Sequence, residues 1–339
     1  MMYPTREAYR DAWSLAATVD PPIPLNVDIE LASLCNLTCP FCFISDGSFD
    51  EMIRQKATDG KPKARMMPTE LAEIVIDKCV RAGVPAIKMN WRGESTLHPD
   101  YHRILAYAAR AARRGAARCS CHAFGAHPAL HDILVNTNAN CGDSAVDGLM
   151  CATKVMVSLD SLTPGIYAVM RRGGRLERAK EVIKELVRRR HPNLWVRRVL
   201  TKLNAGEPFA QQAKSEFGGS IHVSEHHCFD RNQAERHGEP GCDHDMGLDR
   251  TYCTYPSTRI VVSSTGLCYP CCIDLHEEMP VGDIKTQGVR SVWNGEPMRR
   301  LRDQLRRGVY ASKACVGCES WMSYDSPKRE RVQDVEVVA

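Results

Sequence analysis

Apolar and polar positions along the chain follow two alternating periods. Short runs rich in β-branched and aliphatic residues are separated by longer stretches in which apolar residues recur every three or four positions. The first pattern is typical of buried strands and the second of amphipathic helices, and their alternation indicates βαβ units. The expected strands are Asn26–Leu31, Ala86–Asn90, Ile133–Thr137, Lys154–Leu159, Leu194–Leu200 and Ser220–Ser224, and the clearest helices are Thr69–Arg81 and Arg175–Arg190.

Six strands with intervening helices predict an α/β fold, a parallel partial (β/α)6 barrel of the TIM type. In such barrels the functional side chains lie at the carboxyl ends of the strands. We therefore expect the residues that follow each strand to form the functional site.

The character of the sequence changes after Glu225. Residues 226–250 are polar and rich in Gly, His and Asp, which predicts a linker or a lid. A hairpin with strands Thr258–Ser263 and Leu267–Tyr269 is expected next, followed by a polar helix near Pro297–Arg307. The predicted organisation is an N-terminal arm at 1–25, the barrel at 26–225, the linker or lid at 226–250, a small C-terminal α+β domain at 251–325 and a tail at 326–339.

Composition and charge are those of an ordinary globular protein. The 339 residues include 43% hydrophobic and 25% charged residues, and the formal net charge is only +4. Proteins that bind nucleic acids usually have a larger basic excess, so no nucleic-acid partner is expected. No apolar run reaches the roughly 18 residues of a membrane span, and the N-terminus lacks the apolar core of a signal peptide. We expect a cytoplasmic protein with no membrane partner.

The sixteen cysteines are unusual for a chain of this kind. Disulfide frameworks are typical of short secreted chains with small cores, whereas this chain is long and shows no export signal. Several of the cysteines are separated by only two residues. Thiolate ligands for a metal or an iron–sulfur cluster, in a reducing compartment, explain them better than disulfides do.

Three cysteines follow the first expected strand directly. Cys35, Cys39 and Cys42 form a CxxxCxxC pattern, and the aromatic Phe41 precedes the last of them. Three thiolates on one short loop can bind three irons of a [4Fe–4S] cluster and leave the fourth iron open to another ligand. A zinc knuckle would need a fourth ligand, and no further Cys or His lies at finger spacing. The pattern resembles the signature of the radical S-adenosylmethionine (SAM) superfamily.

This resemblance implies a cofactor and a chemistry. In the superfamily, the amino and carboxylate groups of SAM chelate the open iron, and one electron from the cluster cleaves SAM to a 5′-deoxyadenosyl radical. That radical abstracts hydrogen from a substrate, while the protein orients the reactants and excludes side reactions. The resemblance also assigns Phe41 to the cofactor site and implies an electron donor such as flavodoxin or ferredoxin.

Segments after the later strands resemble further motifs of the superfamily. Gly93 and Glu94 match part of its GGE segment, in which the small residues admit the methionyl group of SAM and the acid contacts its amino group. Arg92 stands where the first glycine of that segment is usual. Asn138 resembles the end of the TNG segment, and Ser158 ends the fourth strand, where members place ribose-contacting residues. The resemblance therefore implies that these residues bind the cofactor.

Arg197 and Arg198 are neighbours on the fifth expected strand, so one points into the barrel and the other outward. We take Arg197 as the inward residue, because an inward arginine could anchor the SAM carboxylate or an anionic group of the substrate. The outward arginine would extend its charged group to water.

A second set of cysteines, Cys253, Cys271, Cys315 and Cys318, has the spacing C-x17-C-x43-C-x2-C. The Gly-x4-Cys step and the closing CxxC resemble the twitch module, a shortened form of the SPASM domain. The resemblance implies one auxiliary [4Fe–4S] cluster. Four thiolates would saturate it, so it could pass electrons but could not bind substrate.

Two alternatives remain open for this second set. Cys268 and Cys272 are possible ligands in place of Cys271, although Cys271 keeps the Gly-x4-Cys spacing. A structural zinc ribbon is the alternative metal centre, because zinc also takes four thiolates.

The remaining cysteines are not expected to bind metal. Cys228 and Cys242 follow the sixth expected strand, beside His226 and His227, and are candidate catalytic residues. Either could donate a hydrogen atom to a substrate radical, as in radical epimerases that resemble this architecture. Buried or incidental thiols are expected, in preference to a third metal site, at Cys119, Cys121, Cys141 and Cys151.

These features predict a radical SAM oxidoreductase that modifies a small molecule of a biosynthetic pathway, with the auxiliary cluster as electron acceptor. The cysteine spacing is closest to that of a superfamily member that oxidises an aminocyclitol alcohol. One alternative is a maturase that forms thioethers in a peptide or epimerises it, although the roughly 25 residues before the first strand are short for a peptide-recognition domain. The alternative outside the enzymes is a zinc-stabilised binding module.

Overall fold

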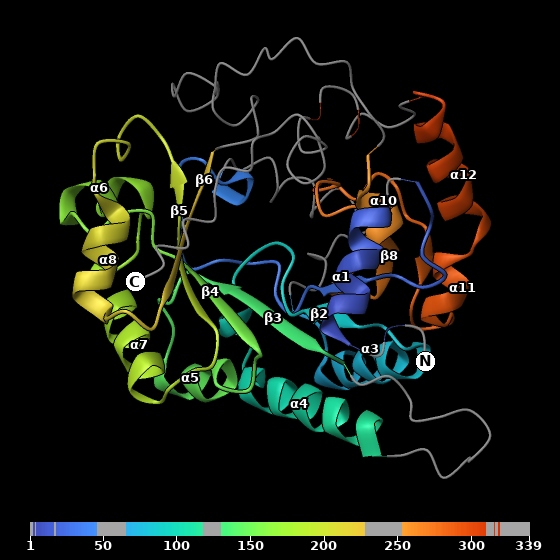
Figure 1. Ribbon diagram of the computed structural model, residues 1–339, viewed down its shortest axis with the longest axis horizontal. Helices are drawn as coiled ribbons and strands as arrows, with labels where there is room; N and C mark the ends of the chain where they lie inside the picture. The colour runs from blue at the N-terminus through green and yellow to red at the C-terminus, as the bar shows by residue number, and fades with distance from the viewer. Residues whose placement is uncertain are drawn as a thin grey trace, which may run out of the picture.

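A computed structural model of the chain describes residues 3, 5–16, 18–45, 66–117, 130–227, 253–309, 315 and 318, without the side chains of 114–117 and 227. Its centre is a nine-stranded sheet in the order β6-β5-β4-β3-β2-β1-β7-β8-β9 (Figure 1). β1 to β7 pair with one another in parallel, whereas β8 pairs antiparallel with both β7 and β9. The strands are β1 Asn26–Ile29, β2 Ala86–Lys88, β3 Asp132–Thr137, β4 Lys154–Ser158, β5 Leu194–Leu200, β6 His222–His227, β7 Arg259–Val262, β8 Leu267–Tyr269 and β9 Gly282–Asp283.

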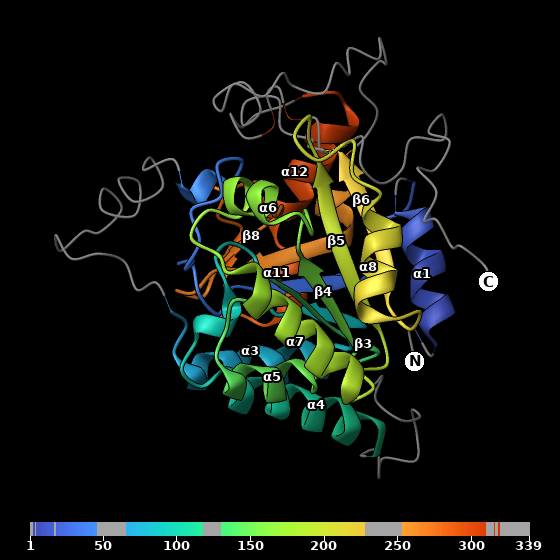
Figure 2. The ribbon, with the colours of Figure 1, turned by 90° about the vertical axis from the view of Figure 1, so that its left-hand side faces the viewer.

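Helices α3, α4, α5, α7 and α8 pack side by side along the outer face of the sheet (Figure 2). Their apolar residues recur at helical spacing, and in α7 the buried positions run from Leu176 to Leu186 on one face. α3 ends at Gly83, whose left-handed φ of 80° lets its N–H bond the carbonyls of Cys79 and Val80. The helices are α1 Arg6–Leu15, α3 Thr69–Ala82, α4 Tyr101–Ala117, α5 Asp143–Leu149, α6 Pro164–Met170, α7 Leu176–Arg188, α8 Phe209–Phe217, α10 Tyr255–Thr258, α11 Val289–Trp293 and α12 Glu296–Arg306, with 3-10 turns at Phe43–Ser45 and Ser95–Leu97.

The sequence-based expectation of a parallel partial (β/α)6 barrel is confirmed, and β1 to β6 occupy the six expected places. The expected sixth strand, Ser220–Ser224, begins two residues before the observed β6, because Gly218 adopts a φ of 90° at the end of α8 and the turn delays the strand to His222. As a result His226 and His227 belong to β6 and do not follow it. The expected hairpin and the polar helix α12 are also found.

The C-terminal hairpin continues the sheet of the barrel. Each residue of β1 has a parallel partner in β7, from the pair Asn26–Arg259 to the pair Ile29–Val262. The indole of Trp293 in α11 also donates a hydrogen bond to the carbonyl of Pro21. The barrel and the small C-terminal region therefore share one sheet.

The N-terminal segment, expected only as an arm, contains the helix α1. Thr5 caps it by accepting a hydrogen bond from the N–H of Ala8. The hydroxyl of Tyr9 donates to Asp132 at the start of β3, and Arg259 at the start of β7 lies over the ring of Trp13. α1 therefore lies against the amino ends of the strands.

The two faces of the sheet differ in chemistry. Val27, Ile87, Ile133, Val155 and Val196 lie in the main apolar core beneath the helices. Successive strand residues point to opposite faces, so their neighbours line the inner face of the barrel. That inner set includes Asp28, Lys88, Asn136, Ser158, Arg197 and Ser224. Within the described part of the chain, no helix has the length and apolar character required to cross a membrane.

Candidate functional site

The loop after β1 carries Cys35, Cys39 and Cys42. The N–H of Cys42 donates to the carbonyl of Cys39 at 3.0 Å, and the N–H of Leu37 donates to the sulfur of Cys35 at 3.4 Å. The N–H of Thr38 donates to the carbonyl of Arg172 at 2.9 Å, which ties the loop to the segment after α6. Short turns and one distant anchor therefore hold three thiols on a single loop at the carboxyl edge of the sheet.

Polar side chains from two later segments, one after β3 and one after α6, approach these thiols. The amide of Asn138 donates to the sulfur of Cys35 at 3.7 Å, and the guanidinium of Arg171 donates to that of Cys39 at 3.8 Å. Arg171 also pairs with Asp160 at 2.6 Å. Burial raises the pKa of the Cys35 thiol to about 12 and also raises that of Cys39, which Arg171 opposes. N–H donors near sulfur and a loop with three thiols fit an iron–sulfur cluster with one open iron.

Gly93 and Glu94 lie directly beside this loop, as the motif predicts. The N–H of Glu94 donates to the carbonyl of Leu34 at 2.9 Å. Gly93 has a φ of 67°, and a Cβ at this position would lie 2.4 Å from the carbonyl oxygen of Ala32. A glycine is therefore required here because the backbone of the cluster loop passes so close.

The side chain of Glu94 makes hydrogen bonds to neighbouring residues of the protein. One of its oxygens accepts from the Thr96 hydroxyl at 2.7 Å and the Thr137 hydroxyl at 2.8 Å, and the other accepts from the N–H of Asn138 at 2.7 Å. Only 3% of the residue is exposed, and burial raises its pKa. Glu94 thus joins the ends of β2 and β3 next to the cluster loop, and its contact with SAM stays a prediction.

Three other predicted cofactor residues lie around the same edge of the sheet. Phe41 packs beneath Arg171, whose guanidinium carbon is 5.5 Å from the ring centroid. Ser158 and Arg197 are register partners on β4 and β5, and the Nε of Arg197 donates to the hydroxyl of Ser224 at 3.5 Å. Arg197 is therefore on the inner face, as expected.

Arg198 differs from expectation. Its side chain does not extend to water, and only 4% of the residue is exposed. The guanidinium donates to the carbonyl of Asn204 at 2.7 Å and pairs with Glu225 at 2.9 Å. Its guanidinium carbon also lies 5.2 Å from the ring centroid of Phe209 in α8. Arg198 therefore anchors the loop that leads into α8.

The second set of cysteines comes together from three segments. Cys253, Cys271 and Cys315 share one apolar cluster that includes Leu301 of α12. The N–H of Cys318 donates to the carbonyl of Cys315 at 3.3 Å. A site with thiols from before β7, after β8 and beyond α12 fits an auxiliary iron–sulfur cluster.

Cys268 and Cys272, the two alternative ligands, have different surroundings. Cys268 is fully buried in the main core near Cys79, apart from the apolar cluster that holds Cys253 and Cys271, and this placement does not favour it as a ligand. Cys272 packs against the same cluster as Cys271. A hydrogen bond from Cys271 lowers the pKa of the Cys272 thiol, and the nearby Arg259 lowers it further. The choice between Cys271 and Cys272 stays open.

The other cysteines divide into two groups. Cys141 is buried in the main core, and the half-buried thiol of Cys151 donates to the carbonyl of Asp147. All described cysteines carry free thiols. Among the described residues, no three His, Cys, Asp or Glu side chains are grouped as ligands of a single ion. The candidate catalytic residues Cys228 and Cys242, together with Cys119 and Cys121, lie outside the described residues.

Several residues of the site were not predicted from the sequence. Arg171 and Asp160 form an ion pair beside Cys39, and Asn36 accepts a hydrogen bond from Asn138 at 2.9 Å. The Arg-Arg-Gly-Gly segment that begins at Arg171 could have indicated a turn at the barrel edge. Its contact with the cluster loop depends on the fold and has no local signal.

Family models match two parts of the chain. The model described as the radical SAM superfamily matches residues 29–207, just over half of the chain. The model described as an iron–sulfur cluster-binding domain, SPASM, matches residues 253–319. No curated protein matches the sequence.

Solved structures with the same fold are found at low sequence identity. BtrN in complex with AdoMet and 2-DOIA is 16% identical with a TM-score of 0.52, and the match covers 88% of this chain and 94% of that one. SuiB of Streptococcus suis bound to S-adenosylmethionine is 16% identical with a TM-score of 0.60, covering 92% and 75%. Native anSMEcpe with AdoMet and the Cp18Cys peptide is 14% identical with a TM-score of 0.56, covering 87% and 86%.

At these identities the structures show the fold alone, whereas the family models show the family. The chain belongs to the radical SAM superfamily and has a C-terminal SPASM domain, so that its cofactors are S-adenosylmethionine and [4Fe–4S] clusters.

Proposed function

We propose that this enzyme oxidises a small, polar, hydroxylated molecule of a biosynthetic pathway, with the auxiliary cluster as the acceptor of the substrate's second electron. Bound SAM supplies the 5′-deoxyadenosyl radical that removes one hydrogen atom from the substrate. The residues proposed to hold the first cluster are Cys35, Cys39 and Cys42, and those proposed for the auxiliary cluster are Cys253, Cys271, Cys315 and Cys318.

The proposal of a polar substrate rests on the polar inner face of the barrel. Lys88, Asn136 and Ser224 alternate with apolar residues of the helix-facing core, and Arg197 bonds Ser224 on this face. Hydrogen-bonding groups on the walls of a site favour hydroxyl-bearing or anionic ligands over apolar ones. We assign Arg197 to an anionic group of the substrate or to the SAM carboxylate.

The cysteine set of the SPASM domain supports oxidation as the net reaction. Four thiolates saturate a cluster, which leaves it no site for substrate but suits it for electron transfer. BtrN, which was solved with AdoMet and 2-DOIA, is matched over 94% of its length. This is an analogy of fold, and it supports the class of reaction without identifying the substrate.

A peptide substrate is the second candidate. The structure of SuiB bound to the precursor peptide SuiA resembles this chain with a TM-score of 0.59, and the match covers 93% of this chain. The structure of anSMEcpe was also solved with a peptide. Under this alternative the polar inner face would receive one side chain of a peptide, and the product would be a cross-linked, oxidised or epimerised residue.

Isotope transfer distinguishes the two candidates. The reconstituted enzyme would be incubated anaerobically with SAM, a reductant and deuterated aminocyclitols, sugars or peptides. We expect deuterium in 5′-deoxyadenosine and a ketone product only with a carbinol substrate. We expect Arg197→Gln to lower the yield of both, unlike Arg189→Gln, which removes an exposed ion pair with Asp147. Deuterium transfer from peptides alone would contradict the proposal.

A further inference from the structure

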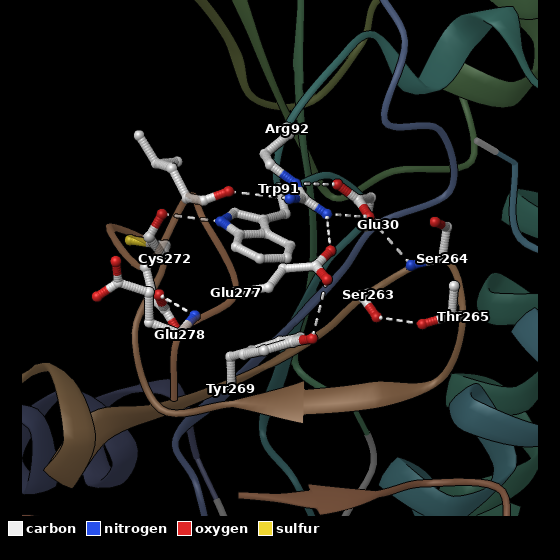
Figure 3. Close-up of polar contacts among 12 residues, drawn as sticks. Glu30, Trp91, Arg92, Ser263, Ser264, Thr265, Tyr269, Cys272, Glu277 and Glu278 are labelled. Atoms are coloured by element: carbon white, nitrogen blue, oxygen red, sulfur yellow. Dashed lines mark hydrogen bonds and ion pairs between the residues drawn. The ribbon is translucent and has the colours of Figure 1, made fainter. Parts of the chain in front are cut away.

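Arg92, which replaces a glycine of the expected motif, forms a buried ion-pair network. Its Nε and Nη2 donate to the two oxygens of Glu30 at 2.6 and 2.9 Å, and Nη2 also donates to Glu277 at 2.7 Å. Its Nη1 donates to the carbonyl of Leu275 at 3.0 Å. Figure 3 shows the guanidinium between Glu30 and Glu277. All three charged side chains are at most 2% exposed.

The carboxylates of this network have further partners. Glu30 also accepts from the N–H of Ser264 at 3.0 Å, and Glu277 accepts from the hydroxyl of Tyr269 at 3.1 Å. Burial lowers the pKa of Arg92, but Glu30 and Glu277 outweigh it and keep the guanidinium charged. Two carboxylates and one guanidinium leave a formal charge of −1. Buried ion pairs add little net stability compared with apolar residues of the same size, so stability alone does not explain the network.

The network connects the two candidate cluster loops. Arg92 precedes Gly93 and Glu94, and the N–H of Glu94 donates to the carbonyl of Leu34, the residue before Cys35. On the other side, Leu275 and Glu277 follow the cysteine pair at 271–272. The indole of Trp91 donates to the carbonyl of Cys272 at 2.8 Å, and its ring lies 5.5 Å from that of Tyr269. Residues 91–92 therefore hold the segment 272–277 by two hydrogen bonds to backbone carbonyls and one ion pair (Figure 3). A glycine in place of Arg92 could make none of the side-chain contacts.

We propose that Trp91 and Arg92 are positioning residues that fix the auxiliary-cluster loop against the SAM-cluster loop, and that the Glu30–Arg92–Glu277 network sets the reduction potential of the auxiliary cluster. This inference rests on the proposed ligation of that cluster by Cys271. A fixed negative charge beside the loop stabilises the oxidised cluster more than the reduced one, which carries one more negative charge. The network therefore holds the potential of the auxiliary cluster low.

The test isolates the auxiliary cluster. A parent protein in which Cys35, Cys39 and Cys42 are replaced by alanine would be reconstituted anaerobically, so that its iron and its reduced electron paramagnetic resonance (EPR) signal come from the auxiliary site alone. Arg92→Lys and Glu277→Gln are then introduced into this parent. Arg103→Lys is the matched control, because Arg103 pairs with Glu73 on the surface between α4 and α3.

We expect Glu277→Gln to shift the midpoint potential of the auxiliary cluster to a more positive value, because it removes one negative charge and keeps an oxygen for Arg92. Arg92→Lys should alter the EPR signal and speed hydrogen exchange of the segment 273–279, since lysine cannot make all the contacts of the guanidinium. Arg103→Lys should change none of these.

The inference would be overturned if the iron-loaded variants kept the midpoint potential, the EPR signal and the hydrogen-exchange rates of the parent. A fall in their melting temperatures would not rescue it. A parent without iron would overturn the proposed ligation, and the inference with it. Where Arg92→Lys fails to fold, the potential of Glu277→Gln decides alone.

Discussion

At the scale of single residues, two side chains from distant parts of the chain donate hydrogen bonds to the thiols of the proposed cluster loop. Asn138 and Arg171 donate to the sulfurs of Cys35 and Cys39, and Asp160 holds Arg171 in place. Hydrogen bonds to cluster sulfurs favour the reduced, more negative state. If Cys35 and Cys39 bind the SAM cluster as proposed, these contacts would make the delivery of an electron to it easier.

We expect Arg171→Gln to shift the potential of this cluster to more negative values by on the order of 50 mV, close to a factor of ten for a one-electron couple. The reason is the loss of a positive charge beside Cys39. A redox titration followed by EPR measures the shift. The exposed variant Arg189→Gln serves as control, and equal potentials in the two proteins would refute the role of Arg171.

Gly93→Ala tests the close approach of the cluster loop. A methyl group would lie 2.4 Å from the carbonyl oxygen of Ala32, at a φ of 67°. We expect a loss of about 2–4 kcal/mol of stability from strain and overpacking, together with a lower iron content. Gly206→Ala, where a Cβ would meet nothing within 4 Å, should change stability by less than about 0.5 kcal/mol. Similar melting temperatures of the two variants would show that the loop has room.

The sequence predicts those residues of the site whose pattern is local. Cys35, Cys39 and Cys42 lie within eight residues, and Gly93 and Glu94 follow a recognisable strand. Arg171 lies 132 positions from Cys39, so their contact depends on the fold and leaves no mark in either segment. The partners of Arg92 are likewise distant in sequence, so the sequence shows only that Arg92 replaces a glycine of the motif.

At the scale of elements, the strands were predicted well because buried parallel strands form continuous apolar runs. Leu194–Leu200 agrees at both ends with the observed β5. The helix α1 is absent from the sequence-based expectation because Tyr9 is its only buried residue, which leaves a narrow apolar stripe. Turns at glycines such as Gly218 also decide where a strand begins, and the apolar pattern alone does not locate them.

The connection between α7 and β5 introduces a pH dependence. His191 is buried, its Nε2 bonds the carbonyl of Ala152 and its Nδ1 accepts from the N–H of Asn193. Burial lowers its pKa from the ordinary value of 6.5. The neutral ring is thus favoured in the folded state, and its contribution to stability is complete above pH 6.5 and is lost as the pH falls through the lowered pKa.

Urea midpoints measured between pH 8 and pH 5.5 should therefore decline for the apoprotein. His191→Asn keeps an acceptor for Asn193 and has no group that titrates in this range. It should be less stable at pH 8 but show a smaller decline. An equal decline in both proteins would assign the pH dependence to other groups.

At the scale of the whole molecule, the central feature is one sheet that runs from the barrel into the SPASM domain. The pairing of β1 with β7 joins residues more than 200 positions apart, and the sequence, which predicts the hairpin, gives no sign of its partner. Parallel pairing between segments so distant in sequence is expected to form late in folding, after the intervening elements have formed.

We expect a fragment of residues 1–250 not to fold into a stable barrel. Loss of β7 would expose the backbone edge of β1, and exposed edges of apolar strands favour aggregation. Size-exclusion chromatography and thermal melting of the fragment measure this. A soluble monomer with a cooperative melting transition would show that the barrel folds without the C-terminal strands.

The central claim is that the loop of Cys35, Cys39 and Cys42 binds the cluster that cleaves SAM. The most direct measurement is the formation of 5′-deoxyadenosine by the reduced, reconstituted protein, with Cys39→Ser beside it and Cys79→Ser, a change in the buried core of α3, as control. The account predicts product from the wild-type protein and from folded Cys79→Ser, and none from Cys39→Ser. Wild-type rates of SAM cleavage by Cys39→Ser would contradict it.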